Sequence, residues 1–187
     1  MLARLSLTGE LGYELNVPAS SQLGLYRALM RAGHGRGLRN IGNRALDSLR
    51  LEKSYAIWST EYTQSVTPGA CGLARHVAYD KGDFIGRTAA LAERASPSPR
   101  VLATIEIDAA DADAAGFEPV KCEGRLVGYV TSGAYGHWVG RSLALGYVDR
   151  EVVAARPALT VDVIGEPRAA RLLDAPAYDP QGLRLRS

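Results

Sequence analysis

The amino-acid sequence predicts an α+β chain, in which a partial α/β portion is followed by a small C-terminal β-barrel. Helical and strand-like periodicities are mixed in the first half of the chain. The run SPSP at residues 96–99 then fixes an extended backbone and removes two hydrogen-bond donors. Beyond it, short alternating segments are separated by glycines, which is typical of a small barrel or sandwich.

The first predicted elements are a hairpin and a helix. Apolar residues alternate between Leu5 and Val17 around two glycines, a pattern that indicates two strands joined by a turn. Because alternation begins almost at the first residue, we expect the α/β portion to be incomplete at its N-terminus. Ser20 and Ser21 are candidate N-caps for a helix that the glycines within residues 33–37 end.

Two further helices are predicted before the barrel. The first covers residues 42–53, with Leu46 and Leu49 on its apolar side. The stretch that follows it lacks periodicity, so we expect a loop of the kind in which ligand contacts gather. The second helix is short, covers residues 84–95 and has Asp83 as its N-cap.

The predicted domain boundary lies at the proline-containing run. Residues 1–95 form the incomplete α+β portion, residues 96–100 a linker, and residues 101–187 the C-terminal β-barrel domain. Alternation over residues 101–107 and again over 159–164 gives the clearest strands.

The composition describes a folded protein with no strong electrostatic preference. The chain has 187 residues, 47% of them hydrophobic, and a formal net charge of +2 with scattered basic residues. This argues against a nucleic-acid binder. No stretch has the length of about 20 apolar residues that a membrane span needs. Neither the two cysteines nor the three histidines have metal-ligand spacing, and we expect a reducing, cytoplasmic location.

Glu14 is the first candidate for a binding residue. A glutamate that points from a strand into an apolar pocket can accept two parallel hydrogen bonds from an amidine-like edge, such as a pterin ring presents. Strand parity places Glu14 on the face opposite Tyr13 and Leu15. From residue type alone, a solvated Glu14 is the more common outcome.

Three other side chains are candidates for ligand contacts, each with a structural alternative. Arg44 could bind a carboxylate, but Asp47 lies where it can pair with an arginine of the same helix, Arg44 or Arg50. Trp58 and Tyr135 could stack on a flat ring. Each could equally be a half-buried packing aromatic with its polar tip in water.

Several motifs in order give the chain a family resemblance. They are TGELGYE at residues 8–14, DSLRLEK at 47–53, KGDFIGR at 81–87, VTSGAYG at 130–136 and LGYV at 145–148. Together they resemble the aminomethyltransferase family, which includes the glycine-cleavage T-protein. The resemblance implies a tetrahydrofolate-dependent enzyme that transfers a one-carbon unit from a methylated amine. It also implies that Glu14 pairs with the pterin ring of tetrahydrofolate.

The resemblance is less specific for the other candidates. Arg44 lies about two residues from the arginine that contacts ligand in glycine-cleavage members. Tyr135 lies in a segment similar to a barrel loop of the family. The family's catalytic aspartate lies in an earlier segment, so no residue here inherits that role. We expect this chain by itself to recognise folate without turnover.

Within the family, the chain is most similar to the folate-binding region of dimethylglycine and sarcosine dehydrogenases. Arg44-Ala45, Glu52-Lys53 and Ile57-Trp58 match that region. This implies FAD only in a missing or separate domain, and as partners a flavin dehydrogenase domain or subunit, or a carrier protein. The alternative is a non-catalytic folate-binding or subunit-docking module of the same superfamily. Superfamily proteins that assist iron–sulfur cluster assembly resemble this chain but carry a cysteine at the position of Asp83. The difference disfavours a non-catalytic folate-binding protein of that kind.

Overall fold

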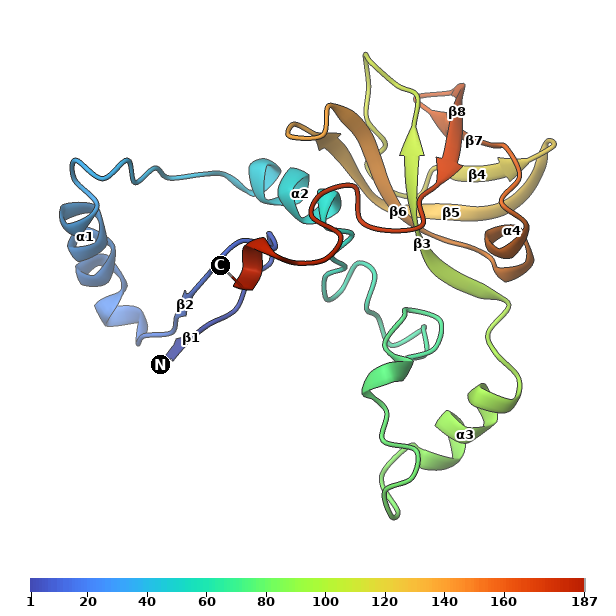
Figure 1. Ribbon diagram of the computed structural model, residues 1–187, viewed down its shortest axis with the longest axis horizontal. Coiled ribbons are helices and arrows are strands. Elements are labelled where there is room, and N and C mark those ends of the chain that lie inside the picture. The colour runs from blue at the N-terminus through green and yellow to red at the C-terminus, as the bar shows by residue number, and fades with distance from the viewer. Residues whose placement is uncertain (187) are drawn as a thin grey trace.

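The computed structural model describes residues 1–186, and its largest unit is a closed antiparallel barrel (Figure 1). The barrel confirms the predicted fold class. Around it the strands follow the order β3-β6-β5-β4-β7-β8, and β8 pairs with β3 to close the ring. Their bounds are Arg100–Ile107 for β3, Pro119–Cys122 for β4, Arg125–Gly136 for β5, Arg141–Asp149 for β6, Leu159–Val163 for β7 and Glu166–Leu172 for β8.

The barrel forms because alternate residues of its strands are apolar and meet in its interior. In β7, Leu159, Val161 and Val163 are buried while the residues between them are half-buried. A short helix, α4 (Arg150–Ala155), follows β6 and adds Val152 to the same core. The buried members of this core are Ile105, Ile107, Ala114, Val120, Val127, Val130, Ala144, Val148, Val152, Leu159, Val161, Val163 and Leu172.

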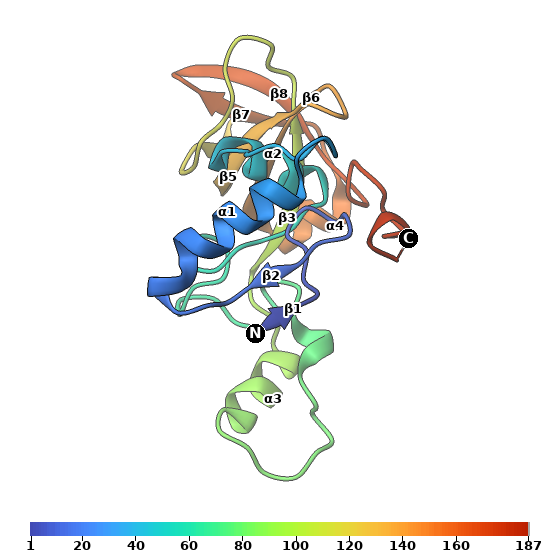
Figure 2. The same cartoon turned by 90° about the vertical axis from the view of Figure 1, so that its left-hand side faces the viewer.

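The N-terminal residues form an arm that extends away from the barrel (Figure 1), and the arm points toward the viewer in Figure 2. The predicted hairpin is present but short, and the prediction of its first strand is wrong: β1 (Leu2–Ala3), rather than a segment around Leu5 and Leu7, pairs with β2 (Glu14–Leu15). The 3₁₀ turn η1 (Ala19–Ser21) leads into helix α1 (Gln22–Ala32). Ser21 is the N-cap residue, although its side chain makes no capping hydrogen bond, and Gly33 ends the helix as predicted.

The arm has almost no interior of its own. Gly9 is the one buried residue among positions 1–41. The large apolar side chains of the arm that remain exposed are Met1, Leu2, Leu5, Leu7, Leu11, Tyr13, Leu15, Leu23, Tyr26, Leu29, Leu38 and Ile41. Exposed apolar side chains in such number, where they adjoin one another, usually mark a contact with another polypeptide or ligand.

Helix α2 (Asn43–Glu52) connects the arm to the barrel and lies against β5 and β6. Its predicted bounds are confirmed, but its predicted apolar side is wrong. Leu46 and Leu49 are only partly buried, whereas Leu51 is fully buried against the barrel. The face of α2 that is turned to the barrel carries polar side chains, and they are buried because they hydrogen-bond to neighbouring segments. In the sequence alone, these polar residues look like a face exposed to solvent.

A long irregular segment follows α2, as predicted, and contains the 3₁₀ turn η2 (Ala74–His76). Helix α3 (Arg87–Ala95) starts later than expected, and its N-cap is Gly86 rather than Asp83. Asp83 instead accepts a hydrogen bond from the backbone N–H of Phe84, at 3.0 Å, within the preceding turn. The N-cap prediction is therefore wrong.

The C-terminal strap, defined here as residues 173–186, leaves β8 and returns past α2 to the hairpin (Figure 1). It ends in the 3₁₀ turn η3 (Arg184–Arg186). None of the helices within residues 1–186 is long and apolar enough to cross a membrane.

Candidate functional site

The structure does not bring the predicted binding residues together. Glu14 lies on β2, Arg44 in the first turn of α2, Trp58 in the loop after α2, and Tyr135 near the end of β5. Within residues 1–186, no hydrogen bond, ion pair or ring contact joins any two of them. A ligand that contacts all of them would have to span the molecule.

Glu14 sits on the outer part of the hairpin. It pairs with Ala3 in the two-residue ladder, and its side chain is exposed. Within the described part of the chain its carboxylate has no hydrogen-bond or ionic partner, so both oxygens are available to a ligand. Glu10, the other glutamate of the hairpin, has a structural contact: it accepts a hydrogen bond from the Tyr178 hydroxyl at 2.7 Å.

Arg44 and Trp58 are exposed, and Trp58 retains 72% of its surface. The intra-helix alternative applies to Arg50, whose Nε donates to Asp47 Oδ1 at 2.8 Å. Arg50 itself is buried, with 3% of its side chain exposed. It is therefore part of the packing between α2 and its neighbours, whereas Arg44 has no hydrogen-bond or ionic partner among residues 1–186.

A buried carboxylate that the sequence did not single out organises the loop after α2. Glu61 is fully buried, and its Oε1 accepts hydrogen bonds from Thr131, at 2.8 Å, and from Ser132 of β5. Its Oε2 accepts from the Ile57 N–H at 2.9 Å and lies 3.6 Å from the Arg50 guanidinium. This one side chain joins loop, helix and barrel.

Helix α2 also holds the turn between β5 and β6. Glu52 is buried, and its Oε1 accepts hydrogen bonds from the backbone N–H groups of Trp138, at 2.7 Å, and Val139, at 3.2 Å. Ser48 donates to the Tyr135 carbonyl at 2.7 Å and accepts from the His137 N–H at 3.2 Å. The polar face of α2 is satisfied by the barrel, which fixes the helix against it.

A junction cavity of about 580 Å³ lies where the hairpin, the end of α2, the following loop and the strap meet. Its wall includes Lys53, Tyr55, Tyr62, Cys71 and Arg75, together with apolar residues of all these segments. Burial raises the pKa of the Tyr62 phenol and of the Cys71 thiol, so both are protonated at neutral pH. The neutral aromatic rings and the Arg75 guanidinium of this wall suit a flat ring or an anionic ligand.

The strap closes one side of this junction through Asp179. Its carboxylate accepts hydrogen bonds from the backbone N–H groups of Leu183, at 2.9 Å, and Arg184, at 3.2 Å, and from Lys53 at 3.2 Å. Burial acts to raise the pKa of Asp179, but these donors outweigh it and leave that pKa below 3.8, its ordinary value.

A depressed pKa in the folded state makes Asp179 a source of acid sensitivity. Its ionised form stabilises the fold fully above pH 3.8, and this contribution is lost as the pH falls through the lower folded-state pKa. In urea unfolding, Asp179→Asn should lower the midpoint at pH 7, and the gap to wild type should shrink at pH 3. An equal gap at both pH values would show that the ionised carboxylate contributes nothing.

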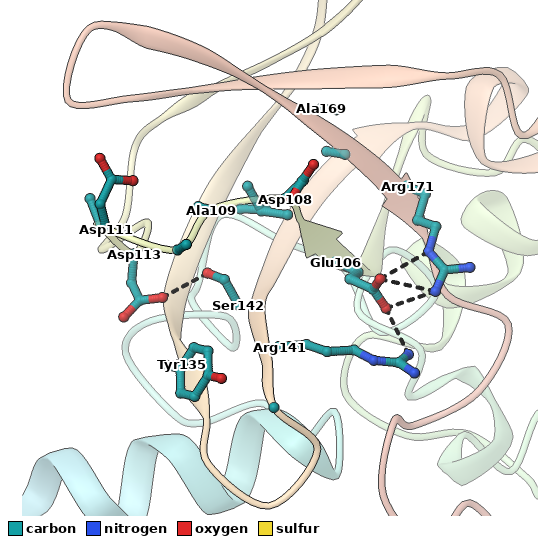
Figure 3. A pocket seen from close by; sticks show the side chains of 15 residues that line it. Glu106, Asp108, Ala109, Asp111, Asp113, Tyr135, Arg141, Ser142, Ala169 and Arg171 are labelled. Atoms are coloured by element: carbon teal, nitrogen blue, oxygen red, sulfur yellow. Dashed lines mark hydrogen bonds and ion pairs between the residues drawn. The ribbon is translucent and has the colours of Figure 1, made fainter.

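A second cavity, of about 730 Å³, lies at one end of the barrel (Figure 3). Glu106 on one side accepts hydrogen bonds from Arg141, at 3.0 Å, and from Arg171, at 2.9 Å. Across the cavity, Asp113 accepts from Ser142 at 2.7 Å, and Tyr135 lines the same side. Only Glu106, Arg141 and Arg171 pair with one another, and the lining as a whole has two more carboxylates than guanidinium groups. Tyr135 therefore faces a cavity separate from the junction.

The chain matches two family profiles that lie in the same order as its two parts. The GCVT N-terminal domain profile matches residues 1–81, and the glycine cleavage T-protein C-terminal barrel domain profile matches residues 100–179. The second match covers all six strands of the barrel.

Individual relatives and a solved structure point the same way. Dimethylglycine dehydrogenase of Rattus norvegicus is 33% identical over 98% of this chain and 22% of its own length. An aminomethyltransferase of Streptomyces avermitilis is 38% identical over 97% of this chain and 50% of its own. The crystal structure of glycine cleavage system aminomethyltransferase T from Bartonella henselae superposes with a TM-score of 0.84 at 26% identity, over 96% of this chain and 50% of that one.

The chain spans half or less of the length of these relatives. Within that span the agreement includes both the order of the elements and the closed barrel. On the two profile matches, the sequence identities and the shared fold, this chain belongs to the aminomethyltransferase family, the family of the glycine-cleavage T-protein.

Proposed function

We propose that this chain is the tetrahydrofolate-binding portion of an enzyme that transfers a one-carbon unit from a methylated amine, a glycine derivative, to tetrahydrofolate. The observation that carries the proposal is the exposed, unpaired carboxylate of Glu14 within the TGELGYE hairpin of a chain that matches both family profiles. The names of the relatives, aminomethyltransferase and dimethylglycine dehydrogenase, support the same class of reaction.

Glu14 fits the pterin because its two oxygens can accept two parallel hydrogen bonds from the N–H groups of one ring edge. Arg44 and Trp58 are exposed and remain candidates for the carboxylate end and the flat rings of folate. The junction cavity supplies a wall with the aromatic rings of Tyr55 and Tyr62 and the guanidinium of Arg75. Tyr135 lies on the barrel-end cavity, and a folate contact there stays a prediction.

In this proposal the chain contributes binding and orientation. Holding folate so that its ring nitrogens meet the one-carbon donor converts a bimolecular step into an effectively unimolecular one. No described residue of this chain is assigned the role of the acid that protonates the departing amine. We place that role on the part of the family fold that this chain does not span, in the same or another polypeptide.

We further propose that the chain divides into an α+β portion over residues 1–95 and a barrel domain over residues 101–187, and that it works in the cytoplasm. Its partners are the amine substrate and a flavin dehydrogenase domain or subunit, or a carrier protein. Both cysteines are free thiols, which is consistent with a reducing compartment.

Binding of folinic acid, a stable tetrahydrofolate derivative, tests the proposal. We expect saturable binding in calorimetry by the protein in its natural full length, and Glu14→Gln should weaken it by about tenfold to a hundredfold because charged hydrogen bonds are lost. Glu123→Gln, which alters an exposed glutamate of a barrel turn, is the matched control. Equal affinities of wild type and Glu14→Gln would remove Glu14 from the site, and absence of binding would remove the folate function.

A non-catalytic, subunit-docking role is the second candidate, and the apolar arm favours it. Helix α1 contacts little besides η1, and the exposed leucines of the arm leave an apolar surface without a cover within residues 1–186. A protein that binds folinic acid but forms no methylenetetrahydrofolate with any methylated glycine would support this role over the enzymatic one.

A further inference from the structure

Lys53 occupies an unusual place for a lysine, because only 3% of its side chain is exposed. Its Nζ donates to the carbonyl oxygen of Asp179 at 2.5 Å and to the carboxylate of Asp179 at 3.2 Å. The same ammonium lies 5.9 Å from the ring centroid of Tyr55 and 5.8 Å from that of Tyr178. Its charge is thus compensated by an anion and two aromatic faces.

The stem of Lys53 is also the surface on which the hairpin rests. Gly9 has a φ of 77°, and a Cβ built on it would lie 2.3 Å from Lys53 Cε and 2.7 Å from Lys53 Cγ. A side chain at this position would therefore collide with the lysine stem. The backbone of the TGELGYE motif approaches α2 at this point because position 9 has no side chain.

The strap provides a second link between the hairpin and the same lysine. Tyr178 donates its hydroxyl hydrogen bond to Glu10, and its backbone N–H donates to the Glu52 carbonyl at 2.9 Å. Further along, the Arg4 guanidinium donates to the Leu185 carbonyl at 3.0 Å. The strap therefore touches the hairpin beside Gly9, and Lys53 holds the strap through Asp179.

Little else fixes the hairpin. Its ladder has only two residues in each strand, and an isolated two-stranded ribbon is at best marginally stable. Gly9 is its one buried residue, and that burial is the contact with Lys53. The position of Glu14, five residues further along the same hairpin, depends on these contacts.

We propose that Lys53 is a positioning residue for folate recognition: it joins the end of α2 to the C-terminal strap and to the hairpin, and so fixes Glu14 relative to the barrel. This inference rests on the proposed function, in which Glu14 binds the pterin. Lys53 itself touches no ligand in this account, and it acts through Gly9, Tyr178 and Asp179.

Hydrogen exchange and folinic acid affinity, measured on the full-length protein, test the role of Lys53. Lys53→Met keeps the stem and removes the ammonium. We expect the amides of residues 1–17 to exchange faster and folinic acid to bind about tenfold more weakly, within the usual range of coupling between sites. Lys53→Arg keeps the charge and should restore part of both properties. Exchange in β3–β8 should stay as in wild type.

Two further variants separate positioning from general damage. Lys121→Met makes the same change in a lysine that pairs with Asp162 on the barrel, and it should change neither the hairpin nor the affinity. Tyr178→Phe removes only the hydrogen bond to Glu10 and should loosen the hairpin without altering the core.

The outcomes distinguish the two proposals. Unchanged hairpin exchange in both Lys53→Met and Tyr178→Phe would overturn the positioning role. Faster exchange with unchanged folinic acid affinity would overturn it as well, because the hairpin would then move without effect on recognition. A wild-type protein that binds no folinic acid would overturn the proposed function and the positioning role with it, whatever the exchange rates.

Discussion

Glu61→Ala should lower the free energy of unfolding by about 3 to 5 kcal/mol, the usual cost of removing one partner of a buried ion pair. The carboxylate is fully buried and accepts hydrogen bonds from Thr131, Ser132 and the Ile57 N–H. Its removal would leave Ser132 and the Ile57 N–H without their acceptor in an interior that water does not reach, whereas Thr131 would keep the Leu145 carbonyl. It would also leave the buried Arg50 with Asp47, which is 44% exposed, as its remaining anion.

Urea unfolding measures this effect, and Glu151→Ala is the matched control. Glu151 also pairs with an arginine, Arg125 at 3.3 Å, but 76% of its side chain is exposed. An exposed pair of this kind contributes about 0 to 1 kcal/mol. If both variants lost the same small amount of stability, Glu61 would not be the residue that ties the loop to the barrel.

Ile105→Ala should cost about 2 to 5 kcal/mol, because it leaves a cavity in a close-packed core. Ile105 is fully buried, lies in the middle of β3 and pairs with Ala144 of β6 and Leu172 of β8. Few atoms can move to fill the space inside a closed barrel. Strands on both sides of β3 would therefore lose contacts.

The control for this variant is Ile85→Ala, in which the same atoms are removed from a fully exposed side chain. Its unfolding midpoint in urea should match that of wild type within the error of the method. A midpoint for Ile105→Ala close to that of Ile85→Ala would contradict the closed, close-packed barrel interior.

The barrel could be predicted from the sequence because its signal is local. In β7 and in the second half of β3, apolar and polar residues alternate, and this period of two is typical of a sheet with one buried face. The bounds of α2 were also predictable, since Gly42 and Lys53 flank a helical pattern on both sides. These features depend on neighbours in the chain rather than on distant partners.

The buried charges could not be predicted in the same way. Arg50, Glu52 and Lys53 lie at the C-terminal end of α2, and charged residues so close together usually face solvent. Each of the three is nevertheless at least 97% buried. They can be buried because they have hydrogen-bond and ionic partners in other segments, up to 126 residues away in the chain. Residue type and spacing do not encode such pairing, so Glu61 in an aperiodic loop gave no signal at all.

The candidate site was predicted in part. The family motif singled out Glu14, and the structure places it on an exposed hairpin edge with a free carboxylate. The sequence could not show that Tyr135 faces a different cavity, since both residues lie in equally short motifs. It also gave no sign that Gly9 is the glycine that packs on Lys53, because that contact is made across 44 positions of the chain.

The central claim is that folate binds at the hairpin, and a hydrogen-exchange footprint of bound folinic acid on the full-length protein tests it most directly. Our account predicts protection of the amides of residues 8–16 on binding, with little change in residues 108–113 and 140–142 at the barrel-end cavity. Protection confined to the barrel-end cavity, with an unchanged hairpin, would contradict it.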